Sequence, residues 1–407
     1  MTTKTNAYYL ELQKKYLVGV YAPPMVPLKA KGDFVYDVEG KEYIDLAGGI
    51  AVLAAGHNHP SLINALEKQA HELWHLSNAY TNVVCLELAQ KLCTKTFAQK
   101  VFFSNSGAEA NEAAIKLARK YYQDQGKQDK YEFICFNGAF HGRTMATVSA
   151  GGQKKYSSGL GPMLPGIHHA NFNDLDSVRK LADKTKTAAI MVEPIQGEGG
   201  ILPATQEFLS GLKKICEEVD ALLIFDEVQT GVGRTGYLYA YQHYNVVPDI
   251  LTSAKGLGGG FPIAATLTTD KVANCFSVGI HGSTFGGNPL ACAVSNATLD
   301  LVDHPSVYEG VKKKGKRIFD YFTQLNKKMD LFEAPRGMGL LVGAPVKAAY
   351  KEKAKDIRMC AMNRGVMVLL AGTDVIRFAP SLLIEDSTLD LALEKFTLGM
   401  EDFLKKV

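Results

Sequence analysis

Two residues with reactive side chains follow apolar segments of this sequence. The apolar segment 221–225 ends in Asp226, and the shorter apolar segment 248–251 leads to Lys255 and then to the glycine run 258–260. Short apolar segments are typical of buried strands, which place the residues after them at the edge of a sheet. Burial disfavours the ammonium form of a lysine, so its amine becomes a nucleophile that can form a Schiff base. An aspartate nearby could hold the protonated nitrogen of a heterocycle.

Either residue alone has an ordinary structural explanation. An aspartate at a strand end is often a helix N-cap, and a lysine before glycines is usually a solvated loop residue. Together, a Schiff-base lysine and an acid that binds a pyridinium nitrogen are what pyridoxal phosphate requires. The sequence therefore predicts Lys255 and Asp226 as the catalytic residues of a site for this cofactor.

A turn between a predicted strand and an alanine-rich helix is the next feature. The strand covers about 100–104, the turn contains Ser106, Gly107 and Ala108, and the helix extends to about Tyr122. Small residues at a helix start leave backbone N–H groups open to a phosphate. A plain N-cap at this turn explains the same residues equally well.

Two loops after predicted strands carry further candidates. In the first, Phe140 could stack on a flat ring while Arg143 clamps a carboxylate. In the second, the buried strand 188–192 ends in Glu193, and the loop 196–200 contains more glycines than a plain connection needs.

Strands that alternate with helices over about 95–270 must position these residues. This pattern predicts an α/β unit on a mostly parallel sheet, in which ligands lie beyond the carboxyl ends of the strands. An antiparallel meander is expected over 26–46, a loop-rich segment over 151–174, and a helix over 386–404. Short strands are expected at 339–344, 366–370 and 375–378. The predicted organisation is an N-terminal segment 1–50 that packs with the small domain, a large α/β domain 51–290, and a small α+β domain 291–407.

Composition narrows the class of protein. A net charge of +3 spread over 407 residues gives no indication of nucleic acid or of a membrane surface as partner. The seven cysteines lack CxxC or metal-like spacing, and neither a secretory signal nor a membrane-spanning segment is visible, so we expect a soluble cytoplasmic protein. His57 and His59 suggest a metal, but turn chemistry before a helix at Pro60 explains them better, so no metal is expected.

With these residues in view, the chain resembles the ornithine-type (class III) pyridoxal-phosphate-dependent aminotransferases, and most closely their acetylornithine/succinylornithine branch. The resemblance extends from Tyr21 to Pro380. It implies fold type I of these enzymes, with a mostly parallel sheet in a large domain and a smaller α+β domain formed by both chain ends. Five motifs carry it, namely Asn105–Asn111, Phe140–Arg143, Glu193–Gly200, Asp226–Gln229 and Ser253–Lys255.

The resemblance implies cofactor contacts at matching positions. Lys255 would hold the cofactor and move a proton, while Asp226 would bind the ring nitrogen. Phe140 and Val228 would cover the two ring faces, and Gln229 would contact the phenolic oxygen. The complete set of implied cofactor contacts is Ser106, Gly107, Ala108, Phe140, His141, Glu193, Asp226, Val228, Gln229, Lys255 and, from the other subunit of a homodimer, Thr284.

Implied substrate contacts explain how one site takes two substrates. Arg143 would clamp one carboxylate, and Arg377 a second, unless Glu198 neutralises Arg377. When Glu198 pairs with Arg377, the site accepts a donor with a neutral distal end. When Glu198 turns away, the site accepts 2-oxoglutarate. Tyr21 and Ser283 complete the implied substrate contacts.

The expected reaction moves the δ-amino group of N2-acetyl-L-ornithine to 2-oxoglutarate, giving N-acetyl-L-glutamate 5-semialdehyde and L-glutamate. An acylated α-amine is neutral, so its burial is less costly than that of a free ammonium. Succinylornithine of arginine breakdown stays open as the donor, and so does N-succinyl-diaminopimelate of lysine biosynthesis. An aminomutase, a decarboxylase and a non-catalytic cofactor-binding protein are the alternatives from other classes.

Overall fold

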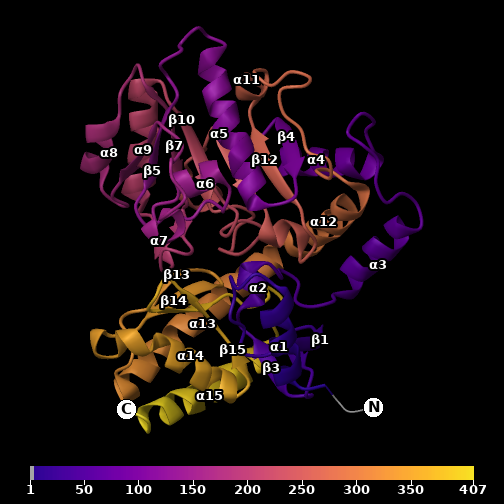
Figure 1. Cartoon of the computed structure of the whole chain (residues 1–407), viewed down its shortest axis with the longest axis vertical. Coiled ribbons are helices and arrows are strands. Elements are labelled where there is room, and N and C mark those ends of the chain that lie inside the picture. The colour runs from indigo at the N-terminus through magenta and orange to yellow at the C-terminus, as the bar shows by residue number, and fades with distance from the viewer. Residues whose placement is uncertain (1–3) are drawn as a thin grey trace.

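The computed structural model describes residues 4–407. A seven-stranded sheet lies in the upper part of Figure 1. The sheet is mostly parallel, but β12 runs antiparallel to both of its neighbours. Its inner strands consist of buried residues, as expected for a sheet covered on both faces. In spatial order the strands are β4 (Lys100–Ser104), β12 (Ala264–Thr268), β11 (Ile250–Ser253), β10 (Leu222–Asp226), β7 (Thr187–Val192), β5 (Glu132–Phe136) and β6 (Ile167–Ala170).

Helices between these strands cover the sheet. The alanine-rich face of α5 packs against β11 and β12, since small side chains let a helix approach a sheet closely. The helices of this part are α3 (Pro60–Ala70), α4 (Val83–Lys95), α5 (Gly107–Gln123), α6 (Met145–Ala150), α7 (Lys154–Ser157), α8 (Leu175–Leu181), α9 (Gln206–Val219), α10 (Tyr241–Tyr244), η1 (Lys255–Gly258), α11 (Asp270–Ala273) and α12 (Pro289–Val302).

Elements from both chain ends lie together in the lower part of Figure 1. The meander β1 (Pro27–Lys31), β2 (Phe34–Asp37) and β3 (Glu42–Asp45) pairs with β15 (Val366–Met367) from the other end of the chain. A second, antiparallel sheet has the order β13 (Arg336–Met338), β14 (Leu341–Pro345), β17 (Val375–Phe378) and β16 (Leu369–Ala371). The helices here are α1 (Asn6–Tyr16), α2 (Gly48–Ala51), α13 (Pro305–Met329), η2 (Ala348–Lys353), α14 (Ala354–Asn363) and α15 (Asp386–Leu404), and the short β8 (Ile195–Gln196) and β9 (Leu202–Pro203) pair with each other.

The predicted fold class, an α/β unit with a mostly parallel sheet and an α+β part made by both chain ends, is confirmed. The domain boundaries at residues 50 and 290 stay predictions. The segment 151–174 is loop-rich, as predicted, and it also contains two short elements that the pattern did not predict, α7 and the edge strand β6.

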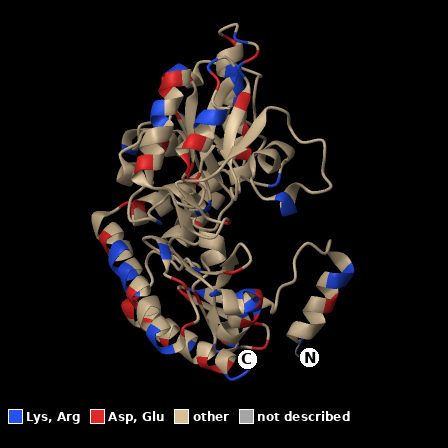
Figure 2. Ribbon diagram, turned by 90° about the vertical axis from the view of Figure 1, so that its left-hand side faces the viewer, with Lys and Arg blue, Asp and Glu red and all other residues tan. Residues whose placement is uncertain are grey.

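The surface carries charges of both signs. In the view of Figure 2, Lys and Arg are interspersed with Asp and Glu along the helices. Within residues 4–407, none of the helices is long and apolar enough to cross a membrane.

Candidate active site

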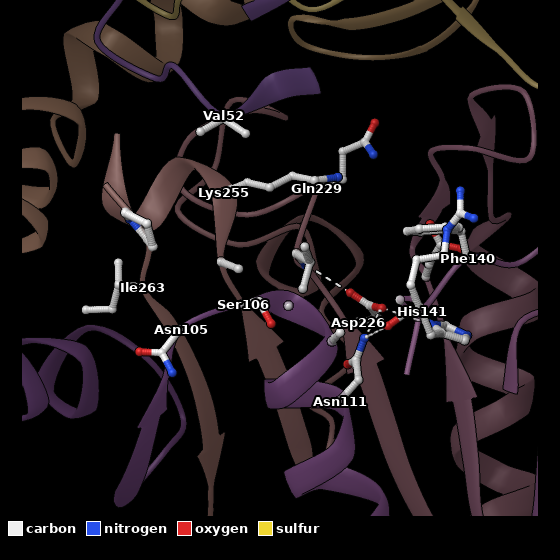
Figure 3. A pocket seen from close by; sticks show the side chains of 18 of the residues that line it. Val52, Asn105, Ser106, Asn111, Phe140, His141, Asp226, Gln229, Lys255 and Ile263 are labelled. Atoms are coloured by element: carbon white, nitrogen blue, oxygen red, sulfur yellow. Dashed lines mark hydrogen bonds and ion pairs between the residues drawn. The ribbon is translucent and has the colours of Figure 1, made fainter. Parts of the chain in front are cut away.

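A cavity of about 400 Å³ lies at the carboxyl ends of β10 and β11, beside the start of α5. This volume lies within the range of small-molecule sites. Figure 3 shows how side chains from different elements meet there. Of the predicted site residues, the cavity is lined by Ser106, Gly107, Ala108, Phe140, His141, Arg143, Glu193, Asp226, Val228, Gln229 and Lys255.

Lys255 begins the short helix η1 directly behind β11. Its φ of 44° lies in the left-handed region, where a residue with a side chain is strained, and such strain is concentrated at functional sites. Burial lowers the pKa of Lys255 to about 8, and the positive charge of Arg377 acts in the same direction. A large share of this amine is therefore uncharged at mildly alkaline pH, as a nucleophile or a proton carrier requires.

Asp226 ends β10, and three donors converge on its carboxylate. The ring Nδ1 of His141 lies 2.8 Å from Oδ2, and the side-chain amide of Asn111 donates to the same oxygen at 2.8 Å. The backbone N–H of Val228 donates to Oδ1 at 3.0 Å. Burial opposes a charge on His141, but the hydrogen bond and the charge of Asp226 outweigh it and raise the pKa of His141. The carboxylate is thus fixed in orientation from three segments of the chain.

Glu193 lines the cavity and ties two loops together. Its carboxylate accepts hydrogen bonds from the backbone N–H of Phe140 at 2.9 Å and of Gly197 at 3.0 Å. Burial raises the pKa of Glu193 to about 7. Its contacts are with loops that line or flank the cavity.

The start of α5 has the features of an anion site. The side chain of Ser106 caps the helix by accepting the N–H of Glu109 at 3.3 Å, while the N–H groups of Gly107 and Ala108 belong to the first turn and have no intrahelical acceptor. A Cβ on Gly107 would lie 2.8 Å from a methyl carbon of Val228, so only glycine fits there. The cap therefore leaves the N–H groups of Gly107 and Ala108 available to an anion.

Phe140 and Arg143 line the cavity, and Tyr156 packs against both of them. Phe140 and Tyr156 meet edge to face with ring centroids 5.5 Å apart, and the guanidinium of Arg143 lies 3.9 Å from the Tyr156 ring centroid. Stacking on Tyr156 holds Arg143 at the cavity, where its planar donor fork could receive a carboxylate.

Arg377 on β17 forms an ion pair with Glu198 and donates to Oε1 of Gln229 at 3.2 Å. Arg377 is only 2% exposed. Burial disfavours a charge on Glu198, but the charge of Arg377 outweighs it and lowers the pKa of Glu198. Gln229 lines the cavity, so it connects this buried pair to the site.

Five predicted residues do not line the cavity, and two of them, Glu198 and Arg377, form the buried ion pair described above. Tyr21 is 82% exposed, and Thr284 is exposed in the loop before α12. Ser283 accepts a hydrogen bond at 3.1 Å from Asn105, which does line the cavity. Their roles as contacts stay predictions.

The prediction omitted Asn111, which lines the cavity and donates to Asp226, and Thr252, which donates to Asn111. It also omitted Val52 and the segment 260–263. One signal was present in the sequence, because Asn111 is an amide on the otherwise alanine-rich buried face of α5.

Comparison with known proteins identifies what this arrangement is similar to. A family model described as aminotransferase class-III matches residues 17–399. The chain is 53% identical over 383 residues to a succinylornithine transaminase/acetylornithine aminotransferase of Pseudomonas aeruginosa, with 94% of each chain covered. It is 53% identical to an acetylornithine aminotransferase of Pseudomonas putida, covering 93% of this chain and 94% of that one. A succinylornithine transaminase of Yersinia pseudotuberculosis is 52% identical, covering 97% and 96%.

Solved structures give the same result. The ornithine aminotransferase of Toxoplasma gondii superposes with a TM-score of 0.95 at 32% identity, covering 100% of this chain and 97% of that one. The N-acetylornithine aminotransferase of Stenotrophomonas maltophilia has a TM-score of 0.86 at 38% identity, covering 98% and 100%.

Proposed function

Since the chain belongs to the class-III aminotransferase family, we propose that it moves the δ-amino group of N2-acetyl-L-ornithine to 2-oxoglutarate. The products are N-acetyl-L-glutamate 5-semialdehyde and L-glutamate, as in arginine biosynthesis. The observation that carries this proposal is the closed pair of Glu198 and Arg377 beside the cavity. The pair cancels the charge of an arginine that would otherwise stay buried and unpaired beside the neutral distal end of the donor.

The cofactor of this enzyme is pyridoxal phosphate, and the residues that line the cavity fit it. The start of α5 suits the phosphate, Asp226 suits the ring nitrogen, Lys255 suits the carbonyl carbon, and Phe140 and Val228 offer apolar surfaces for the ring. When bound, the cofactor supplies a carbonyl that takes up the amino group and a ring that accepts the charge left after proton removal.

The two catalytic residues have separate tasks in this proposal. Lys255 removes a proton from the donor carbon that bears the amino group, for which an amine with a pKa of about 8 is suited. Asp226 keeps a proton on the ring nitrogen, and His141 and Asn111 hold its carboxylate in place. Glu193 holds the loop that carries Phe140.

The remaining charged residues select substrates. Arg143 binds the carboxylate that donor and acceptor share, through paired N–H donors. When Glu198 turns away, Arg377 is free to bind the second carboxylate of 2-oxoglutarate. Gln229, which already accepts from Arg377, keeps the guanidinium aligned during this exchange.

A succinylated donor is the second candidate, supported by the 52% identical relative from Yersinia pseudotuberculosis that is named succinylornithine transaminase. N2-succinylornithine would place the enzyme in arginine breakdown, and N-succinyl-diaminopimelate in lysine biosynthesis. The mechanism is the same for all three donors. A cytoplasmic location is part of the proposal, because all seven cysteines are free thiols, which a reducing compartment maintains.

We also propose a homodimer in which Thr284 reaches the cavity of the other subunit. Its loop is held to the segment 74–86, since Asn78 donates to the carbonyls of Ser283 and Gly286 at 2.8 and 3.0 Å. This surface exposes large apolar side chains that a second copy would cover, which are Trp74, Tyr80, Val83, Leu86 and Phe285.

A single half-reaction tests the substrate. The cofactor-loaded protein is mixed with N2-acetylornithine, N2-succinylornithine or ornithine without a keto acid, and the change from pyridoxal to pyridoxamine absorbance is timed. We expect the acetyl compound to react fastest. A faster reaction with the succinyl compound would assign the second candidate, and no reaction with any of the three would refute an ornithine-type donor.

A further inference from the structure

Asn111 connects three segments that are far apart in the sequence. Its side-chain amide donates to Oδ2 of Asp226 at 2.8 Å and to the backbone carbonyl of His141 at 2.8 Å, and its Oδ1 accepts the hydroxyl of Thr252 at 2.7 Å. The labelled side chains of Asn111, Asp226 and His141 lie together at the floor of the cavity in Figure 3. Asn111 is 1% exposed and Thr252 is fully buried.

The Thr252 hydroxyl supports the one orientation of this amide that its other two neighbours allow. Both hydrogens of the Asn111 amide face oxygen acceptors, and its oxygen faces a donor. A flipped amide would place Oδ1 against the carboxylate of Asp226 and against the carbonyl of His141, which is repulsive at low dielectric. A valine at position 252 would remove the donor that favours the present orientation.

Thr252 is itself placed by the sheet. It is the register partner of Asp226 in the parallel pair β10–β11, and its carbonyl accepts the backbone N–H of Glu227 at 2.9 Å. Asn111 lies one turn after Gly107 on α5, the helix whose start forms the anion site. The Asn111 amide thus links α5, whose start would bind the phosphate, to Asp226, which would bind the ring nitrogen.

We propose that Asn111 and Thr252 are positioning residues that act through Asp226. The hydroxyl of Thr252 holds the amide oxygen in place, and the amide holds Oδ2. Oδ1, which accepts the backbone N–H of Val228, keeps a second lone pair for the ring nitrogen. The inference rests on the proposed function, because it concerns the proton that Asp226 keeps on the cofactor ring.

The test measures that proton directly. Apo-protein is loaded with pyridoxal phosphate labelled with ¹⁵N in the ring, and the pH at which the ring nitrogen loses its proton is followed by ¹⁵N NMR. T252V is expected to lower this pH by about one unit, which is a tenfold loss of proton affinity. A fall of about tenfold in kcat with KM within about twofold is expected to accompany it. N111L, which removes the amide, is expected to cause a larger shift and serves if T252V does not fold.

Two controls separate positioning from general damage. T252S keeps the hydroxyl and is expected to retain the wild-type titration. T266V removes another buried hydroxyl, which donates at 2.9 Å to the carbonyl of Ala110 on the same helix and not to Asn111. It is expected to leave the titration unchanged. The inference is overturned if T252V and N111L titrate like the wild type, or if T266V shifts as much as T252V. A wild-type protein that carries out no half-reaction would instead refute the proposed function.

Discussion

Arg377 and Glu198 form an ion pair between a strand of the small α+β part and a glycine-rich loop of the large sheet unit. Arg377 is almost completely buried, and Glu198 is 19% exposed on its side chain. A buried arginine without a counter-charge would be costly, so the closed pair is the stable state of the site before a dicarboxylate arrives. Glu198 is the more accessible partner, and it is therefore the one that can move.

Removal of the Glu198 charge is expected to change which donor the enzyme prefers. In E198Q, Arg377 keeps its charge without a partner. A dicarboxylic donor such as L-glutamate should therefore bind more tightly, and a donor with a neutral distal end should bind more weakly. We expect the ratio of kcat/KM for L-glutamate to that for N2-acetylornithine to rise about tenfold or more, or ~1.4 kcal/mol in relative transition-state binding. Half-reaction kinetics with each donor measure it.

The matched control is E218Q, which removes the glutamate of another arginine pair. Glu218 and Arg179 lie 2.6 Å apart on the surface, with both side chains about half exposed. Exposed pairs contribute little, so E218Q is expected to keep the wild-type ratio. An unchanged ratio in E198Q would contradict the proposed role of the pair.

Lys255 is expected to react at a lower pH than an ordinary lysine. Its pKa of about 8 means that the uncharged, nucleophilic amine accumulates as the pH rises through 8. The rate of covalent attachment of pyridoxal phosphate to the apo-protein, followed by absorbance, should therefore rise with a midpoint near 8. K255A is the control and should show no such attachment. A rate that keeps rising towards pH 10 would disprove this environment for Lys255.

The same shift predicts how the stability of the apo-protein depends on pH. The folded-state pKa of Lys255 lies below the ordinary value of 10.5, so between about pH 8 and 10.5 the unfolded chain binds more protons at this residue. Its contribution to the free energy of unfolding should therefore increase with pH in this window. Urea denaturation of the wild type and K255A at several pH values measures the difference.

Much of the fold follows from local sequence patterns. The strand predicted at 375–378 and the helix predicted at 386–404 coincide with β17 and α15. The segment 366–370 reads as one strand in the sequence, but the structure has two strands there, β15 and β16. β15 pairs with β3, whereas β16 pairs with β17, and the choice of partner depends on the packing of distant parts of the chain. The edge strand β6 escapes prediction because two histidines occupy its centre.

The sequence predicts those site residues whose chemistry follows from their type and from their place at a strand end. Lys255 and Asp226 could be assigned from the ends of two apolar segments, because neighbouring parallel strands deliver their ends to the same edge. Asn111 and Thr252 could not, since their importance depends on hydrogen bonds among α5, β10 and β11 that no spacing reveals. Thr284 lies outside the cavity of its own chain, so geometry within one subunit leaves its role a prediction.

Subunit hybrids test the proposed exchange of Thr284. If each site combines Lys255 of one subunit with Thr284 of the other, a hybrid of K255A and T284A has one doubly altered site and one intact site. We expect K255A homodimers to be inactive and T284A homodimers to bind the cofactor weakly. Random reassociation of equal amounts makes half of the dimers hybrids with one intact site each, so activity should recover to about one quarter of the wild type. A mixture no more active than the mean of the two separate variants would show that Thr284 serves its own subunit or none.

The matched control is K255A mixed with T94A, which changes an exposed threonine on α4 whose hydroxyl donates only to the carbonyl of Gln90 in the same helix. Half of the sites in this mixture carry Lys255, so its activity should be about one half of that of the wild type.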